Sequence, residues 1–228
     1  MNKNLKIIKS SEANNFFNRN LYFYKNKDDK HNLENSRIKN LIKINNLKSK
    51  SILEIGCATG IRLNQYQKIL HSKINYGIDL SSNAIRLGKK KYKRLKLLKL
   101  SSLEINKIKE NFDLIICGFF LYLLDREEIF NQFNLIYKKL KADGYLIIHD
   151  FDPLFKHTNT SIHNNNLKSF KMSYDNFLEE SGLFKTVYKI RNDFCQTNVN
   201  DKNFFKSKDT AITLYKKINF IHSYPENL

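Results

Sequence analysis

This sequence lacks any long apolar run. No stretch approaches the roughly 18 consecutive apolar residues that a bilayer-spanning helix requires, and its basic start has no apolar core long enough for a secretion signal. Cysteine is scarce too. Cys57, Cys117 and Cys195 are an odd number without CxxC spacing, which argues against a disulfide framework and for a reducing compartment. We therefore expect a cytoplasmic protein with no membrane span.

Internal repeats and linkers are also absent, so the 228 residues are expected to form one core. Hydrophobic residues make up 41% and aromatic residues 13% of the chain, which supports a packed globule and excludes a largely disordered polymer. Residues 1–35 are polar around an aromatic knot, and we interpret them as a helical extension that covers a site as a lid. Residues 36–228 would form the main domain.

The sequence has few acidic residues. Its 22 Asp and Glu are outnumbered by 40 Lys and Arg, which gives a net charge of +18. Such an excess favours nucleic acid, an anionic membrane or a phosphorylated substrate as a partner. The excess is mostly lysine, however, and it is spread along the chain, as expected of a solvated surface or a compositional bias. Both interpretations stay open at this point.

Short apolar runs alternate with amphipathic stretches between residues 51 and 151, a pattern typical of parallel strands joined by crossover helices. The continuous apolar runs indicate strands that are covered on both faces. The expected strands are Ser51–Ile55, Ile74–Ile78, Leu95–Leu100, Phe112–Cys117 and Tyr145–Phe151, and helices are expected over Arg37–Leu47, Ile61–His71 and Asn83–Lys91.

The strongest helical pattern lies between the last two of these strands. Asp125 and Glu128 have the spacing of a capping box at its start, and Gly144 follows its lysine-rich last turn. Its apolar stripe comprises Ile129, Phe130, Phe133, Ile136, Tyr137 and Leu140.

The sequence changes character after the fifth strand. Residues 153–170 are rich in His, Asn, Ser and Thr and predict a loop on the substrate side, followed by a helix over Ser173–Glu180. Lys185–Ile190 and Thr210–Lys216 are predicted to be strands that close the sheet antiparallel. The fold class is therefore α/β.

A glycine loop follows the first strand in Ser51-Ile-Leu-Glu-Ile-Gly-Cys-Ala-Thr-Gly60. Gly56 and Gly60 allow a tight turn and a close approach of the backbone to a ligand, and the next helix presents free N–H groups. Glu54 would repel a pyrophosphate but suits the amino group of an amino acid. Asp79, at the end of the second strand, is placed to bind ribose hydroxyls. The two carboxylates together indicate a nucleoside joined to a cationic amino acid.

These segments resemble class I S-adenosylmethionine (SAM)-dependent methyltransferases over about residues 35–152. Leu53–Gly60 is similar to their glycine-rich loop, and Gly77-Ile-Asp-Leu-Ser81 to their ribose-binding strand end. Phe112–Cys117 with Leu121–Leu124, and then Leu140–Ile148, are similar to their fourth and fifth strands. The resemblance implies a Rossmann-like, seven-stranded fold, SAM as cofactor, and a cofactor site formed by Glu54, Gly56, Cys57, Ala58, Gly60, Asp79, Leu80, Ser101, Ser102 and Cys117.

Two positions depart from the family pattern. Ala58 stands where a middle glycine is common, and the acidic residue that often contacts adenine after the third strand is missing. Ser101 or Ser102 would take its place, so that adenine recognition rests on a hydroxyl or a backbone amide.

The acceptor site is expected at the carboxyl edge of the sheet, where His149-Asp-Phe-Asp-Pro153 follows strand five. His149 would serve as the base that takes the acceptor's proton, and Asp150 or Asp152 would orient it or bind a polyol. Tyr122, His157 and His163 are candidates for substrate contacts. The alternative is a structural role for His149, loop capping for Asp150 and Asp152, and a place in the core for Tyr122. No metal site is expected, because the spacing matches no recognised ligand pattern.

A narrower resemblance concerns Phe16–Asn20, Ile148–Pro153 and Phe170–Tyr174. These segments are similar to bacterial methyltransferases associated with surface-polysaccharide and nonulosonic-acid sugar biosynthesis. This resemblance implies Arg19 and Tyr22 as lid contacts and a phosphorylated or nucleotide-linked sugar as a small-molecule substrate.

Two other functions remain open. An RNA methyltransferase would use the basic surface, although Cys117-Gly-Phe-Phe120 differs from the Pro-Pro-aromatic motif of enzymes that methylate base nitrogens, and no cysteine follows a proline as in enzymes that methylate a pyrimidine carbon. A non-catalytic assembly subunit with this fold is the second alternative. The sequence leaves the oligomeric state open.

Overall fold

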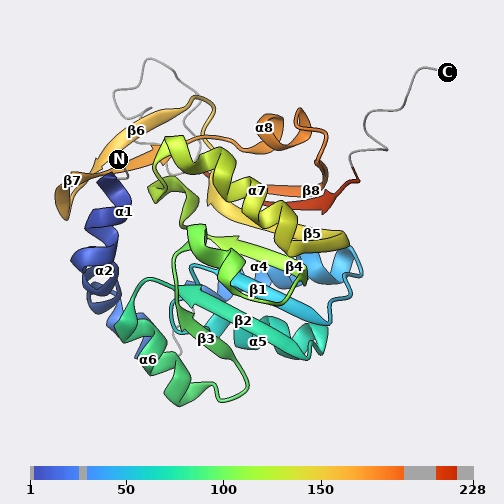
Figure 1. The fold of residues 1–228 in the computed structure, drawn as a ribbon, viewed down its shortest axis with the longest axis horizontal. Helices are drawn as coiled ribbons and strands as arrows, with labels where there is room; N and C mark the ends of the chain where they lie inside the picture. Colours follow the sequence, from blue (N-terminus) through green and yellow to red (C-terminus); the bar gives the residue numbers. More distant parts are fainter. Residues whose placement is uncertain (1–2, 26–29, 193–208, 220–228) are drawn as a thin grey trace.

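The structure, a computed structural model, describes residues 3–25, 30–192 and 209–219. A seven-stranded sheet with the order β3-β2-β1-β4-β5-β9-β8 runs through its centre (Figure 1). The first five strands of that order are mutually parallel, whereas β9 pairs antiparallel with both β5 and β8. The strands are β1 (Ser51–Ile55), β2 (Ile74–Asp79), β3 (Lys96–Lys99), β4 (Phe112–Gly118), β5 (Leu140–Phe151), β8 (Phe184–Asn192) and β9 (Thr210–Lys217). The predicted fold class and the antiparallel closure are confirmed.

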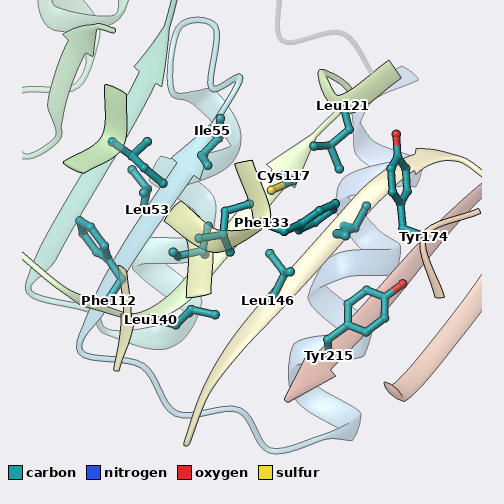
Figure 2. Close-up of a cluster of buried hydrophobic side chains, with 14 of the residues drawn as sticks. Leu53, Ile55, Phe112, Cys117, Leu121, Phe133, Leu140, Leu146, Tyr174 and Tyr215 are labelled. Carbon is teal, nitrogen blue, oxygen red and sulfur yellow. The ribbon is translucent and has the colours of Figure 1, made fainter. Parts of the chain in front are cut away.

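Two apolar cores cover the two faces of this sheet. On one face α4 (Lys30–Ile44), α5 (Ile61–Leu70) and α6 (Ser82–Lys91) bury side chains such as Leu41 and Tyr66. On the other face the covering elements are the 3-10 turn η2 (Ser102–Lys107), α7 (Ile129–Lys139) and α8 (Asp175–Glu179). Figure 2 shows this second core, where Phe133 of α7 meets side chains from β1, β4, β5 and β9. Burial on both faces accounts for the continuous apolar runs of the central strands.

The ends of α7 differ from those predicted. The Asp125 carboxylate does not cap the helix, because it accepts hydrogen bonds from the backbone N–H groups of Asn4 and Leu5, both at 3.2 Å. A 3-10 turn, η4 (Arg126–Glu128), precedes α7 instead. Strand β5 begins at Leu140 directly after the helix, and the left-handed residue of this region is Asp143 (φ 57°) rather than Gly144. Phe130, assigned to the buried stripe, is 72% exposed.

The loop predicted over residues 153–170 is wrong, because β6 (His157–Ser161) and β7 (Asn164–Lys171) form a separate antiparallel ribbon there. We call this ribbon, residues 157–171, the hairpin. Both strands consist mainly of polar residues. A two-stranded ribbon outside the main sheet has little apolar surface to cover, so it needs few apolar side chains. Only Leu167 carries a buried apolar side chain in it, so the alternation typical of a strand is missing from the sequence.

Residues 3–25 form a chain of short helices that we call the strap. It consists of α1 (Lys3–Ile7), one π-helical turn η1 (Ile8–Glu12), α2 (Ala13–Arg19) and α3 (Leu21–Lys25). Figure 1 shows the strap in dark blue along one edge of the molecule, with α1 beside β7 and α2 beside α6. Short helical segments thus make up residues 3–25 of the predicted extension, and its role as a lid stays a prediction. Cys195 lies outside the described residues.

Candidate active site

A cavity of about 590 Å³ lies at the carboxyl ends of β1, β2 and β4. Its floor comes from the loops that follow those strands, and its cover comes from the strap and from the tip of the hairpin. The volume is within the range of about 300–1,000 Å³ that holds cofactors and drug-sized ligands. Elements far apart in the sequence therefore enclose one site at the sheet edge where α/β folds bind ligands.

The glycine loop forms the floor of the cavity. Gly56 (φ 74°), Ala58 (φ 47°) and Gly60 (φ 77°) all adopt left-handed conformations. A Cβ on Gly56 would lie 3.0 Å from the Gly118 carbonyl oxygen, so only glycine fits that turn without a shift of the backbone. Gly56, Cys57 and Ala58 line the cavity, whereas Gly60 starts α5 and packs against Leu97 outside it.

Asp79 joins the end of β2 to the glycine loop. Its carboxylate accepts hydrogen bonds from the backbone N–H groups of Ala58 at 2.9 Å and Ser81 at 2.8 Å. Burial raises the pKa of Asp79, and these hydrogen bonds oppose that rise. Asp79 and the neighbouring Leu80 line the cavity. The carboxylate is thus fixed in place where the sequence predicted a partner for ribose hydroxyls.

Glu54 is fully buried and does not line the cavity. Its carboxylate forms an ion pair with Arg62 Nε at 2.8 Å, and Arg62 Nη2 also donates to the Gly56 carbonyl at 3.0 Å. Burial raises the pKa of Glu54 to about 7, while the Arg62 charge acts in the opposite direction. Arg62 reaches the cavity wall in place of Glu54. The direct contact predicted between Glu54 and the cofactor's amino group therefore has no support from this geometry.

Arg62 was not predicted from the sequence, although its distance from Glu54 along the chain could have indicated an ion pair between the two. It lies eight residues after Glu54 on the first turns of α5, on the side that faces the end of β4. A Cβ on Gly118 would come within 2.5 Å of Arg62 Nη2, so the guanidinium lies directly over that glycine.

Of the remaining residues predicted to bind the cofactor, one lines the cavity and the others lie behind its wall. Ser102 lines the cavity, whereas the Ser101 side chain caps η2 together with Glu104 in a capping box. Cys117 is buried within β4, and the next residue, Gly118, lines the cavity.

Two asparagines tie the strap to the rest of the molecule. Asn4 is 2% exposed, and its side chain donates to the carbonyls of Leu123 at 2.9 Å and Lys168 at 2.6 Å and accepts from the Lys168 N–H at 3.1 Å. The Asn14 carbonyl oxygen accepts from the Ser81 hydroxyl at 2.9 Å, at the start of α6. The strap is thus attached to the hairpin at one end and to the cofactor side at the other.

The strap supplies charged and aromatic groups to the cavity. Arg19 and Glu12 both line it and form an ion pair with each other. Glu12 is only 6% exposed and was not predicted. Tyr24 also lines the cavity, whereas Tyr22, predicted as a lid contact, is 63% exposed and lies outside the lining.

Of the other predicted substrate contacts, Tyr122 and His163 line the cavity. Tyr122 packs edge-on against Phe151, with the ring centroids 5.1 Å apart. His163 lies at the exposed tip of the hairpin. His157 is outside the lining, and its Nδ1 lies 2.9 Å from the Phe155 carbonyl oxygen.

The three predicted catalytic residues are buried around Phe151, which lines the cavity in their stead. His149 packs edge-on against Phe119 at 4.2 Å, and burial lowers its pKa to about 3. The Asp150 carboxylate accepts hydrogen bonds from the N–H groups of Leu121 at 3.0 Å and Phe151 at 2.8 Å. Asp152 forms ion pairs with Lys189 at 2.9 Å and Arg191 at 3.0 Å.

These contacts give Asp150 and Asp152 supporting roles. Asp150 orders the segment after β4, and Asp152 joins β5 to β8. The role of His149 as a base stays a prediction. A histidine with such a low pKa is a weak base, and His149 does not line the cavity.

Within the described ranges, no three His, Cys, Asp or Glu side chains gather in a way that could hold a metal ion. In the same ranges, no helix is long and apolar enough to cross a bilayer.

The residues on the wall fit SAM. A left-handed glycine loop allows close backbone approach, Asp79 offers a fixed carboxylate for the ribose, and Arg62 offers a cation for the carboxylate of the methionine part. The cavity extends beyond these groups to residues of the strap and the hairpin.

Comparisons with known proteins agree with this geometry. The N-methyltransferase NodS from Bradyrhizobium japonicum, solved with S-adenosylhomocysteine (SAH), superimposes with a TM-score of 0.58, 18% identity and coverage of 82% of this chain and 87% of that one. The 1,6-didemethyltoxoflavin-N1-methyltransferase of Burkholderia thailandensis gives a TM-score of 0.67 at 13% identity and covers 94% and 89%. At such identities these similarities concern the fold.

Sequence relatives and a family model extend the comparison. An uncharacterised protein of Rickettsia prowazekii is 27% identical over 190 residues, 78% of this chain and 73% of that protein. O-methyltransferase 3 of Dictyostelium discoideum is 30% identical over 130 residues, 52% of this chain and 30% of that protein. The model of the methyltransferase domain matches residues 46–207. The chain therefore belongs to the methyltransferase domain family, and it is a SAM-dependent class I methyltransferase.

Proposed function

We propose that this enzyme transfers the methyl group of SAM to a small polar acceptor held beneath the strap and the hairpin. The observation that carries the proposal is the cover of the cavity, to which the strap contributes Glu12 and Arg19 and the hairpin His163. Within this proposal, residues 1–35 act as a lid and residues 36–228 as the catalytic domain.

The acceptor that we favour is a sugar hydroxyl, on a phosphorylated or nucleotide-linked sugar. Aromatic rings of Phe119, Tyr122 and Phe151 provide apolar faces in the cavity against which a sugar ring can pack. Arg19 of the strap and His163 of the hairpin are the cationic or protonatable groups in the cover of the cavity, and they suit a phosphate.

The residues of the chain would contribute to methyl transfer mainly by positioning the acceptor and by excluding water. When bound, SAM supplies an electrophilic methyl group on a sulfonium, and the acceptor atom must lie in line with it. Glu12 and Asp79 are the two carboxylates among the lining residues, and Asp79 is already bonded to the glycine loop. Glu12, held by Arg19, is therefore our candidate to accept the proton of the acceptor hydroxyl.

An RNA acceptor is the main alternative, because of the net charge of +18. A nucleotide within a longer strand would have to pass beneath the strap or the hairpin, and both are attached through Asn4. We therefore favour the small acceptor. A non-catalytic assembly subunit is the second alternative, and it would show no turnover of SAM.

The test is mass spectrometry of nucleotide sugars and of RNA after incubation with isotopically labelled SAM. We expect the label in a sugar nucleotide, and none with the Asp79→Ala variant, whose binding of SAH should also be lost by calorimetry. Label in RNA alone would contradict the proposal. Glu12→Gln should retain SAH binding but lose at least about tenfold in kcat, since general base catalysis typically contributes 100-fold or more.

A further inference from the structure

A second hollow lies beside the edge strand β3, and it shares no lining residue with the cofactor cavity. Five lysines surround it, together with one carboxylate, Glu110. The lysines are Lys89, Lys93, Lys96, Lys107 and Lys109, and all five are exposed. The local charge is therefore strongly positive at a concave part of the surface.

These lysines come from separate parts of the chain. Lys89 lies in the last turn of α6 and Lys93 in the loop after it, Lys96 starts β3, Lys107 ends η2, and Lys109 follows it. Lysines that only protect an edge strand from pairing with another chain would lie on that strand. In β3 this applies to Lys96 and Lys99, of which Lys99 is outside the hollow. Edge protection therefore does not account for the cluster.

Three of the five ammonium groups have no acidic partner within residues 3–25, 30–192 and 209–219. Lys107 pairs with Glu104, and Lys96 lies 3.6 Å from Glu110. Among the residues that the structure describes, no carboxylate lies within ion-pair distance of Lys89, Lys93 or Lys109. Elsewhere in the molecule Lys141, Lys189 and Lys216 are paired.

A buried tyrosine organises one wall of the hollow. Tyr76 is 8% exposed, and its hydroxyl accepts a hydrogen bond from Lys96 Nζ at 3.0 Å and donates one to Glu110. Lys96 also lies over the Tyr76 ring, with Nζ 4.9 Å from the centroid. Tyr92, half-buried at the end of α6, adds a second aromatic ring to the lining. The hollow thus combines a fixed cation, unpaired cations and an aromatic surface.

We propose that this hollow binds a nucleoside polyphosphate. Three unpaired ammonium groups match the charge of linked phosphates, which lysine binds as a point charge. An aromatic ring in the same wall gives the base a surface on which to stack. A ligand with one negative charge would leave most of the lysines unneutralised, and a bilayer surface is too flat to enter the hollow.

The test is calorimetry of the full chain with ATP, at low salt and at about 0.15 M salt. We compare the triple variant Lys89→Gln, Lys93→Gln and Lys109→Gln with a control triple, Lys43→Gln, Lys48→Gln and Lys138→Gln, which removes the same charge from other exposed lysines. The first should weaken ATP binding about tenfold, because exposed charge pairs are individually weak and three are removed. The control should change it less than about twofold, and both should bind SAH like the unchanged chain.

Three results would overturn the proposal. The unchanged chain could fail to bind ATP, or both triple variants could weaken ATP binding equally, which would mean diffuse attraction by the net charge. The third is a single-stranded RNA of about 12 nucleotides that displaces ATP and binds through these lysines more than about 100-fold more tightly than ATP does, since the ligand would then be a polynucleotide. Displacement of ATP by pyrophosphate would support the phosphate contacts.

Discussion

The floor and the cover of the cavity are built in different ways. The central part of the floor is made by two successive strand–loop–helix units, in which the glycine loop and Asp79 lie within 25 residues of Glu54 and bond to one another. The cover joins the strap to the hairpin, and its central contact links Asn4 to Lys168 across 164 positions of the sequence. Local rules of chain geometry govern the first region, whereas long-range hydrogen bonds between polar segments govern the second.

The floor and the cover also differ in how strongly the rest of the domain holds them in place. The floor contains fully buried charges and left-handed backbone that the surrounding sheet holds in place. The cover contains short helices and a polar ribbon that bury few apolar side chains. We therefore expect changes in the floor to abolish cofactor binding, and changes in the cover to loosen it while the domain stays folded.

The largest effect is expected from Gly56→Ala in the floor. The added Cβ would lie 3.0 Å from the Gly118 carbonyl oxygen at a residue with φ 74°, so the loop must move. Left-handed strain costs about 1–2 kcal/mol, and displacement of the loop should weaken SAH binding by more than about 100-fold, measured by calorimetry. Gly182→Ala is the control, because Gly182 has a similar φ of 68° and does not line the cavity. Equal loss of SAH binding in both variants would contradict the prediction.

The pH dependence of the free energy of unfolding tests Asp150, the buried residue that supports the floor. Its contribution should change by about 3 kcal/mol between pH 5 and pH 8. Burial raises the pKa of Asp150 to about 7 from an ordinary value of 3.8. The folded state therefore keeps a proton that the unfolded chain releases. The stability this proton contributes is fully present below about pH 4 and is lost as the pH rises through about 7.

Asp150→Asn should lack this part of the pH dependence. In urea unfolding, the difference in free energy of unfolding between variant and unchanged chain should shift in favour of the variant from pH 5 to pH 8. The exposed Asp143→Asn serves as control. A difference that stays constant with pH would show that the Asp150 carboxyl is ionised throughout.

Asn4→Ala tests the cover, with a smaller expected cost. The substitution leaves the Lys168 N–H and the Leu123 carbonyl without their partner, which costs about 1–3 kcal/mol. We expect faster hydrogen exchange and proteolysis across residues 3–25, and about five- to tenfold weaker SAH binding. The neighbouring exposed Ser10→Ala is the control, since its hydroxyl bonds only within the strap. Unchanged exchange in the strap would mean that Asn4 does not hold it.

The same contrast explains what the sequence could predict. The strands, the glycine loop and Asp79 were predictable because each follows from a local pattern and from the rule that parallel strands end at one edge. Arg62 was missed because its partner, Glu54, already had an expected role as a ligand contact. The hairpin was missed because its strands are polar, and Glu12 because nothing local shows that a π-turn points it into a cavity.

His149 and its neighbours show the opposite case, in which a local pattern was present but the side chains do not line the cavity. His149 and Asp150 lie at the end of the strand expected to carry catalysis and Asp152 follows it, and these residue types suit acid–base chemistry. All three are buried, and β9, which comes from a distant part of the chain, pairs with β5 along His149 and Asp150. The sequence predicted that Thr210–Lys216 closes the sheet, but residue type alone could not reveal that Phe151 reaches the cavity instead of these neighbours.

The smallest predicted effect concerns Ala58 in the floor. Its φ of 47° is a conformation that costs an L-residue about 1–2 kcal/mol, whereas glycine adopts it freely. Ala58→Gly removes that strain but increases the entropy of the unfolded chain, a cost of about 0.5–1 kcal/mol. We expect a net gain of about 0.5 kcal/mol in the free energy of unfolding by urea titration, with SAH binding unchanged, because the N–H of residue 58 still donates to Asp79. The exposed helical residue Asn134→Gly should instead lose stability, since glycine has no strain to relieve in a helix. A destabilised Ala58→Gly variant would mean that alanine occupies this turn of the floor without strain. The backbone strain in the floor would then differ less from that in the cover than the φ angles indicate.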